Sequence, residues 1–223
     1  MKTSYLLILF LFAALITDAQ NQIGLLPQIN ADFKIGEDWK VNAKVEGRQL
    51  FIQHPFPEGK NESEFERLDF EFVASKSLSS FDAIGGGYLV RRQNGKFTHR
   101  FIQQYVITQN LFVFRLAHRF RIDQTIENGE KLQLRLRYRA SFEQPLNGLI
   151  VDPGEFYLKL NNEYLGILKD RKGNLEIRGL ACLGYNKSEE DQLETGVDYR
   201  LENIINAESV YKLYLYVGWY HSF

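Results

Sequence analysis

The stretch KLQLRLRYR, residues 131–139, decides how the rest of the chain is interpreted. Leucine or tyrosine alternates in it with glutamine or arginine, from Leu132 to Arg139. Because successive side chains of a β-strand point to opposite faces, this period of two predicts one apolar face and one almost wholly cationic face. In a soluble sheet the leucines would face the core, so the remaining sequence has to show which face lies inside.

The composition favours one β-domain. The chain has 223 residues, and its 14% of aromatic residues include 17 Phe and 12 Tyr, against only 5 Pro. This enrichment fits pleated rather than helical structure, and the length fits a single domain. The net charge of -1 gives no basic footprint for nucleic acid, which we therefore exclude as a partner.

The first segment has the pattern of a secretory signal peptide. Lys2 precedes an apolar run at residues 6–16, and Thr17, Asp18 and Ala19 follow as a short polar and small-residue stretch. The apolar run is shorter than the roughly 20 residues that a membrane-spanning helix needs. We therefore predict a signal peptide at residues 1–19, cleaved near Ala19, and one domain at residues 20–223.

The alternation recurs along the mature chain, and its length is the discriminating feature. Strands of globular proteins average about five or six residues, whereas a tilted strand needs about 9 to 11 to cross a bilayer. The predicted strand segments span residues 23–35, 38–52, 64–74, 81–92, 97–108, 111–124, 131–143, 154–163, 174–185, 192–202 and 210–223. The alternation is less regular between about residues 80 and 108, which include Gly85, Gly86 and Gly87. Such long amphipathic segments predict an all-β fold, an antiparallel transmembrane up-and-down β-barrel with its apolar face toward lipid.

The strand number predicted from these eleven segments is twelve. Bacterial single-chain barrels have an even number of strands, so one segment must be misassigned. A further strand is expected within residues 143–170, and ten strands are the alternative.

The final segment supports an outer-membrane location. Phe223 ends the chain on an alternating strand, which resembles the C-terminal signature of bacterial outer-membrane barrels. This resemblance implies the bacterial outer membrane as location, and as partners its lipids and, through the C-terminal strand, the barrel-assembly machinery. The aromatic residues predicted for the membrane interface are Trp39, Tyr138, Trp219 and Phe223.

Several short motifs resemble one family. They are THRFIQQY at residues 98–105, LAHRFRIDQ at 116–124, LRLRYR at 134–139, PL at 145–146 and NEY at 162–164. They are similar to motifs of the outer-membrane β-barrel family catalogued as domain of unknown function 2490. The resemblance covers most of the mature chain and implies a location and a fold, but no activity.

The face opposite the apolar one is the lumen of such a barrel. The predicted lumen-lining residues are Arg100, Arg115, Arg119, Arg121, Arg135, Arg137, Arg139, Arg178, Asp69, Glu71, Glu194 and Asp198. An unpaired charge away from water costs several kcal/mol, so these groups need water or carboxylate partners. Two hypotheses follow: a porin-like passive pore for small (anionic) solutes, or a closed structural or lipid-interacting barrel with a salt-bridged interior.

A lipid hydrolase is the less favoured alternative. His118 shares the lipid-facing phase, but no serine can be placed beside it, and such chemistry needs a histidine next to a nucleophile. The sequence has no histidine or cysteine cluster with metal-ligand spacing. We therefore predict no catalytic residue, no metal and no cofactor, and the oligomeric state stays open.

Overall fold

The computed structural model describes residues 20–54, 63–206 and 209–223, and this part of the chain forms eleven β-strands without a helix. The strands are β1 Gln20–Ile35, β2 Trp39–His54, β3 Glu64–Ser77, β4 Asp82–Gln93, β5 Lys96–Leu111, β6 Phe114–Glu127, β7 Gln133–Pro145, β8 Phe156–Lys169, β9 Lys172–Asn186, β10 Asp191–Glu202 and β11 Val210–Ser222. The predicted all-β class is confirmed. The predicted signal peptide, residues 1–19, lies outside the described residues.

The strands form one closed barrel, in which β1 pairs with β11. This closing ladder is parallel and runs from Gln20 opposite Val210 to Asp32 opposite Ser222, whereas every other pair of neighbours is antiparallel. In an up-and-down barrel with an odd number of strands, the first and last strands run in the same direction. A parallel ladder also bonds their backbone groups, so closure leaves no edge.

The expectation of twelve strands is therefore wrong, and so is the alternative of ten. No further strand lies within residues 143–170, because β8 follows β7 after a loop at residues 146–155. Two backbone hydrogen bonds fix this loop. At its base the Leu146 N–H donates to the Phe156 carbonyl at 3.0 Å, and further along the Gly154 N–H donates to the Asn186 carbonyl at 2.6 Å. The eleven alternating segments correspond to the eleven strands.

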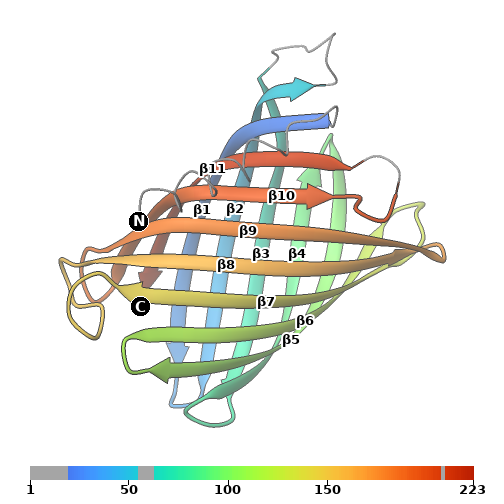
Figure 1. Ribbon diagram of the computed structural model, residues 1–223. Helices are drawn as coiled ribbons and strands as arrows, with labels where there is room; N and C mark the ends of the chain where they lie inside the picture. Colours follow the sequence, from blue (N-terminus) through green and yellow to red (C-terminus); the bar gives the residue numbers. More distant parts are fainter. Residues whose placement is uncertain (1–19, 55–62, 207–208) are drawn as a thin grey trace.

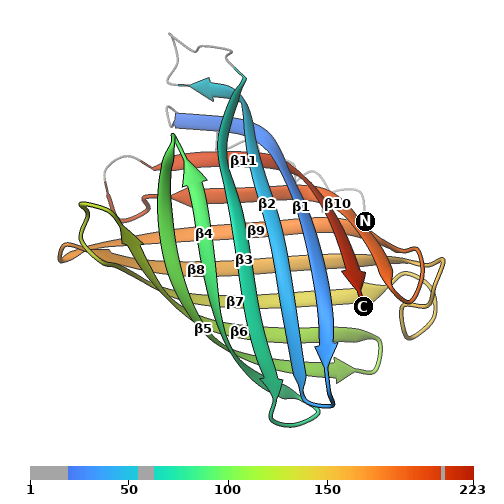
Figure 2. The same cartoon turned by 180° about the vertical axis from the view of Figure 1, so that it is seen from behind.

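Alternation along each strand separates the two surfaces of the barrel. Figures 1 and 2 show its opposite walls, with β6–β10 crossing the near side in Figure 1 and β1–β4 crossing the near side in Figure 2. On β6, for example, Phe120 and Ile122 are exposed on the outer surface, while Arg121 and Asp123 are buried inside. The polar face of the sequence pattern is thus the inner face.

The rings of two inward-facing tyrosines each lie over a glycine of the neighbouring strand. Tyr157 lies opposite Gly184, and a Cβ atom on this glycine would be only 2.1 Å from the ring. Tyr214 lies opposite Gly24 across the parallel ladder, where a Cβ atom would be 3.1 Å from the ring and 2.2 Å from the Gln49 carbonyl oxygen. Each missing side chain makes room for a buried aromatic ring.

Helices contribute nothing to the walls of this barrel. No helix long and apolar enough to cross a membrane is present among the described residues, a finding that does not bear on a crossing by strands.

Candidate functional site

The two arginine ladders of β6 and β7 lie side by side inside the barrel. Arg119 is directly opposite Arg139 and Arg121 is directly opposite Arg137. Like charges in such cross-strand positions repel each other. The ladders therefore require anionic partners from other strands or from solvent.

All the residues predicted to line the lumen lie on the inner face of the barrel. Arg115, Arg119, Arg121, Arg137, Arg139, Arg178, Glu71 and Asp198 line an internal cavity. Asp69, Arg100 and Glu194 are buried and do not line this cavity. Arg135 follows the same inward phase on β7. Whether these groups select or bind a solute stays a prediction.

Two carboxylates each bridge two arginines of the ladders. Glu163 of β8 accepts from Arg137 Nη2 at 2.9 and 3.0 Å and from Arg119 Nη2 at 2.9 Å. Asp123 of β6 accepts from Arg121 Nε at 2.6 Å and from Arg137 Nη1 at 3.1 Å. Hydrogen bonds between charged groups each contribute about 1.5–3 kcal/mol, so these shared acids stabilise the arrangement of the three strands β6–β8 and of the two ladders.

One ion pair crosses the lumen instead of joining neighbouring strands. Arg121 of β6 donates to both carboxylate oxygens of Glu71 on β3, at 3.0 and 2.8 Å, although β4 and β5 separate these strands in the barrel wall. Lys44 adds a further contact to Glu71 at 3.8 Å. This bidentate ion pair spans the interior of the barrel. Charge-assisted pairs of this geometry are among the strongest polar contacts in proteins.

One half of the lumen is filled by side chains, and we refer to it as the closed half. Tyr214 is fully buried there, with the guanidinium carbons of Arg48 and Arg200 at 5.3 and 5.2 Å from its ring centroid. Arg91 donates to Asp69 at 2.7 and 2.6 Å in a second bidentate pair. Further buried inward side chains of this half are Leu50, Arg67, Leu89, Arg100, Thr125 and Leu165.

The other half holds a polar cavity of about 540 Å³. It extends from the end of the barrel where β11 finishes, which we call the C-terminal end. Its lining reaches from Asp32, Lys40 and Arg115, close to the turns at that end, down to Arg121 and Arg200 at the closed half. Among the described residues the lumen therefore holds a polar cavity toward the C-terminal end and packed side chains toward the other end.

Several lumen residues were missing from the sequence prediction, although the alternation contained them. Asp123 continues the inward phase of Arg119 and Arg121, and Glu163 continues that of Lys159. Arg48 also follows the phase of its strand, although a register shift against β3 comes directly after it. A strict extension of the period of two would have found these residues, but not their partners.

The predicted interface aromatics lie on the outer surface. Trp39 and Trp219 are about half exposed, at 49% and 43%, and Phe223 stacks on Phe33 with ring centroids 4.7 Å apart. These three residues lie toward the C-terminal end, whereas Tyr138 lies within β7. Their contact with a membrane interface stays a prediction.

The outer surface shows no assembled catalytic group around His118. Its Nδ1 lies 2.9 Å from the Tyr138 hydroxyl, and within the described residues no serine or carboxylate is hydrogen-bonded to it. The described part of the chain also contains no group of three His, Cys, Asp or Glu side chains that could hold a metal ion. A Tyr–His pair alone lacks the activated nucleophile that ester hydrolysis requires.

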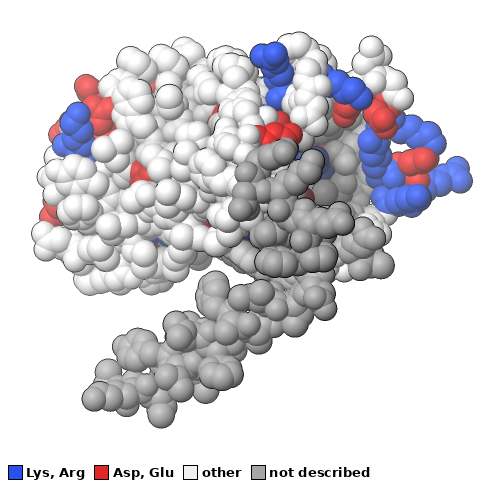
Figure 3. Space-filling model, turned by 90° about the horizontal axis from the view of Figure 1, so that it is seen from above, with Lys and Arg blue, Asp and Glu red and all other residues white. Residues whose placement is uncertain are grey.

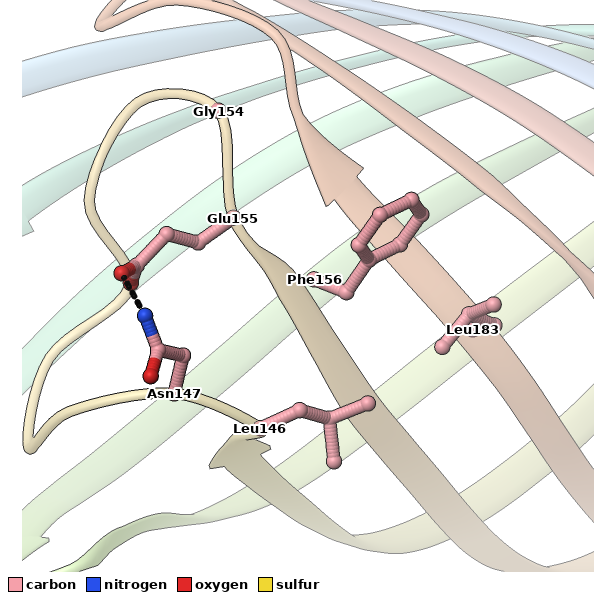
Figure 4. Close-up of a pocket in the computed structure, with 6 residues that line it drawn as sticks. All are labelled: Leu146, Asn147, Gly154, Glu155, Phe156 and Leu183. Carbon is pink, nitrogen blue, oxygen red and sulfur yellow. Dashed lines mark hydrogen bonds between the residues drawn. The ribbon is translucent and has the colours of Figure 1, made fainter.

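A smaller pocket of about 450 Å³ lies under the β7–β8 loop (Figure 4). Leu146, Phe156 and Leu183 form its apolar side, and Asn147 Nδ2 donates to Glu155 Oε1 at 2.7 Å across its rim. Glu155 is its only ionisable side chain. The pocket thus offers no acid–base pair, and the barrel interior is the better candidate site.

Residues 24–210 match a family model described as protein of unknown function (DUF2490). The match extends over most of the chain and confirms the family predicted from the short motifs. No curated protein and no solved structure matches the chain.

Proposed function

The chain belongs to the DUF2490 family of proteins of unknown function, and we propose that it is an integral barrel of the bacterial outer membrane whose lumen is closed at rest by its own ion pairs. The mature protein would begin near Gln20 after export. In this proposal, outer-membrane lipids surround the barrel, and the barrel-assembly machinery inserts it through its C-terminal strand.

The observation that carries the membrane assignment is the apolar outer surface. Every strand contributes at least one large apolar side chain that is between 43% and 63% exposed. These residues are Ile29, Trp39, Phe72, Ile84, Phe101, Phe120, Leu136, Tyr164, Leu183, Val197 and Leu215. Soluble monomers rarely expose continuous apolar patches above a few hundred Å², whereas a barrel in lipid needs a continuous apolar belt.

The distribution of charge supports the same proposal. In the face that Figure 3 shows, most basic and acidic side chains gather toward two opposite edges, and only isolated charged atoms are visible on the broad surface between them. The charged residues of the strand interiors point into the lumen. Lipid chains would thus meet apolar groups, while water meets the charged ends.

The closed lumen follows from the ion pairs that fill it. The Glu71–Arg121 pair spans the interior, and the shared carboxylates of Asp123 and Glu163 hold the neighbouring arginines. Beneath them, Tyr214 lies between Arg48 and Arg200. An ion crossing the barrel would have to break several charge-assisted hydrogen bonds, so we expect no steady conductance.

Planar-bilayer recording of the mature chain, refolded in detergent, tests the closed lumen. Stable insertion without conductance steps is the expected result. Steady anion-selective steps would instead support the porin-like alternative, which the polar cavity of about 540 Å³ favours. The proposed function includes no catalysis, so phospholipid turnover that disappears in His118→Ala would contradict it.

A pair of arginine substitutions tests the membrane assignment separately. Ile122→Arg places a charge on the outer face of β6 and should lower the free energy of unfolding in lipid by about 2–4 kcal/mol. Gln109→Arg, on the outer face of β5 opposite Leu116, places the same charge near the β5–β6 turn, where the expected loss is below about 1 kcal/mol. Urea unfolding in lipid vesicles measures both, and equal effects would contradict a lipid-facing β6. Recovery of the folded chain from water without detergent would refute the membrane proposal as a whole.

A further inference from the structure

Two cavity-lining arginines have no acidic partner among the described residues. Arg139 of β7 and Arg115 of β6 both line the polar cavity. The nearest acid on the neighbouring strand, Glu163, is opposite Arg139 in register. Its carboxylate is already hydrogen-bonded to Arg119 and Arg137. Arg139 therefore has no carboxylate of its own within ion-pair distance among the described residues and shares the field of Glu163 with two other arginines.

Arg119 and Arg139 also share unused hydrogen-bond donors. They are directly opposite each other on β6 and β7, and the Nε atom of each is buried without a hydrogen-bond partner in the described structure. Buried donors without acceptors are rare in folded proteins, and each one suggests a water, an ion or a ligand. Two such donors on adjacent like-charged side chains point to an anion.

The cavity as a whole is cationic and has the size of a ligand site. Ten basic and five acidic side chains line it. Its volume of about 540 Å³ lies within the range of about 300–1,000 Å³ that small-molecule sites occupy. Some of the basic groups are neutralised by acids behind the lining, such as Lys159 by Glu194 at 2.6 Å. Among the described residues Arg115 and Arg139 form no ion pair within 4 Å, although Glu143 lies opposite Arg115 in register.

We propose that this cavity binds the phosphate group of a small water-soluble solute, with Arg119 and Arg139 donating to its oxygens and Arg115 attracting it at the mouth. A phosphate monoester carries nearly two negative charges and presents three acceptor oxygens, and the guanidinium fork of arginine matches this geometry. Ser141, which lies beside Arg139 on the same face and also lines the cavity, supplies a further donor.

The placement of the site favours a soluble phosphate over a lipid headgroup. All three arginines point into the lumen, and the cavity extends to the C-terminal end instead of the outer, apolar surface. A phospholipid would have to bring its acyl chains into this polar interior, where they would lose apolar contacts. This inference rests on the proposed function, since it places a binding site inside a barrel that does not conduct.

Isothermal titration of the refolded mature barrel in non-ionic detergent tests the proposal. The probes are inorganic phosphate and glucose phosphate, with glucose as the neutral control and a short-chain phosphatidic acid as the lipid phosphate, all at constant ionic strength. We expect saturable binding of both soluble phosphates and none of glucose. Binding of phosphatidic acid without binding of glucose phosphate would overturn the assignment to a soluble solute.

Substitutions on β7 provide the matched comparison. Arg139→Gln should weaken phosphate binding by about tenfold or more, since it removes a charge-assisted contact. Arg135→Gln removes the same charge from the same face of the strand, outside the cavity, where Arg135 donates to Gln133 at 3.1 Å; it should change binding by less than about twofold. Equal weakening by both variants would refute a local site. If Arg139→Gln fails to fold, Arg139→Lys, which keeps the charge, replaces it in the comparison.

The outcomes separate this inference from the proposed function. A folded, non-conducting barrel that binds no phosphate overturns the binding site and leaves the proposed function standing. A chain that folds in water without detergent overturns the membrane proposal, and the same titration then decides the phosphate site independently.

Discussion

Arg121 is the side chain on which the closure of the lumen most depends, and Arg121→Leu tests that role. Its side chain is only 2% exposed and forms three hydrogen bonds to two carboxylates, Glu71 at 3.0 and 2.8 Å and Asp123 at 2.6 Å. Leucine keeps apolar bulk at the position but removes the charge. The substitution therefore leaves two carboxylates inside the barrel with fewer cationic neighbours.

The expected loss can be derived from these contacts. Three charge-assisted bonds at about 1.5–3 kcal/mol each set an upper bound. The full sum will not be reached, because Glu71 keeps Lys44 at 3.8 Å and Asp123 keeps Arg137 at 3.1 Å. Removing one partner of a buried ion pair typically costs about 3–5 kcal/mol, and we expect Arg121→Leu to lower the free energy of unfolding by that amount.

Urea unfolding of the barrel in lipid vesicles, followed by fluorescence of Trp39 and Trp219, measures the change. Arg115→Leu is the matched control, because Arg115 lies on the same strand and face but is exposed at the cavity mouth; its expected effect is below about 0.5 kcal/mol. In the double variant with Glu71→Leu, the unneutralised carboxylate of Glu71 is also gone. We expect the two losses to be non-additive by about 1–3 kcal/mol.

Two results would refute this reasoning. A loss in Arg121→Leu below about 1 kcal/mol, the value typical of solvent-exposed ion pairs, would mean that water already surrounds the Glu71–Arg121 pair. Strict additivity in the double variant would mean that the two side chains do not interact across the lumen.

Two further predictions concern aromatic contacts. Gly184→Ala should cost about 1–3 kcal/mol by overpacking against Tyr157, whose ring lies 2.1 Å from the position of the new Cβ atom; in a Tyr157→Leu background the same change should cost much less, and an equal cost in both backgrounds would exclude the clash. Phe223→Ala should lower the free energy of unfolding by about 1 kcal/mol through loss of its stacking on Phe33. Phe223→Tyr should keep the stability, and urea unfolding that does not distinguish Phe223→Ala from the unchanged chain would contradict the stacking contribution.

The alternation of side chains was sufficient to predict most of the wall of the barrel. The period of two places Leu134 and Leu136 on one face and Arg135 and Arg137 on the other, since neighbouring side chains of a strand point to opposite faces. The length of the alternating segments then indicated that the leucines face outward. The same reasoning would have placed Asp123 and Glu163 inside. It could not show which inward groups touch, because a phase on one strand carries no information about the distance across a barrel.

The sequence by itself thus determined the β-class, the eleven segments and the two faces of each strand, because these depend on local backbone geometry. Only the tertiary structure decided how the eleven strands close into a barrel. An alternating pattern is the same whether a strand pairs parallel or antiparallel, so the direct pairing of β1 with β11 could not be read from it. The ion pair between Glu71 and Arg121 likewise forms only because the curvature of the closed sheet brings side chains of strands that are not neighbours within hydrogen-bonding distance. The polar cavity next to this pair has the same origin.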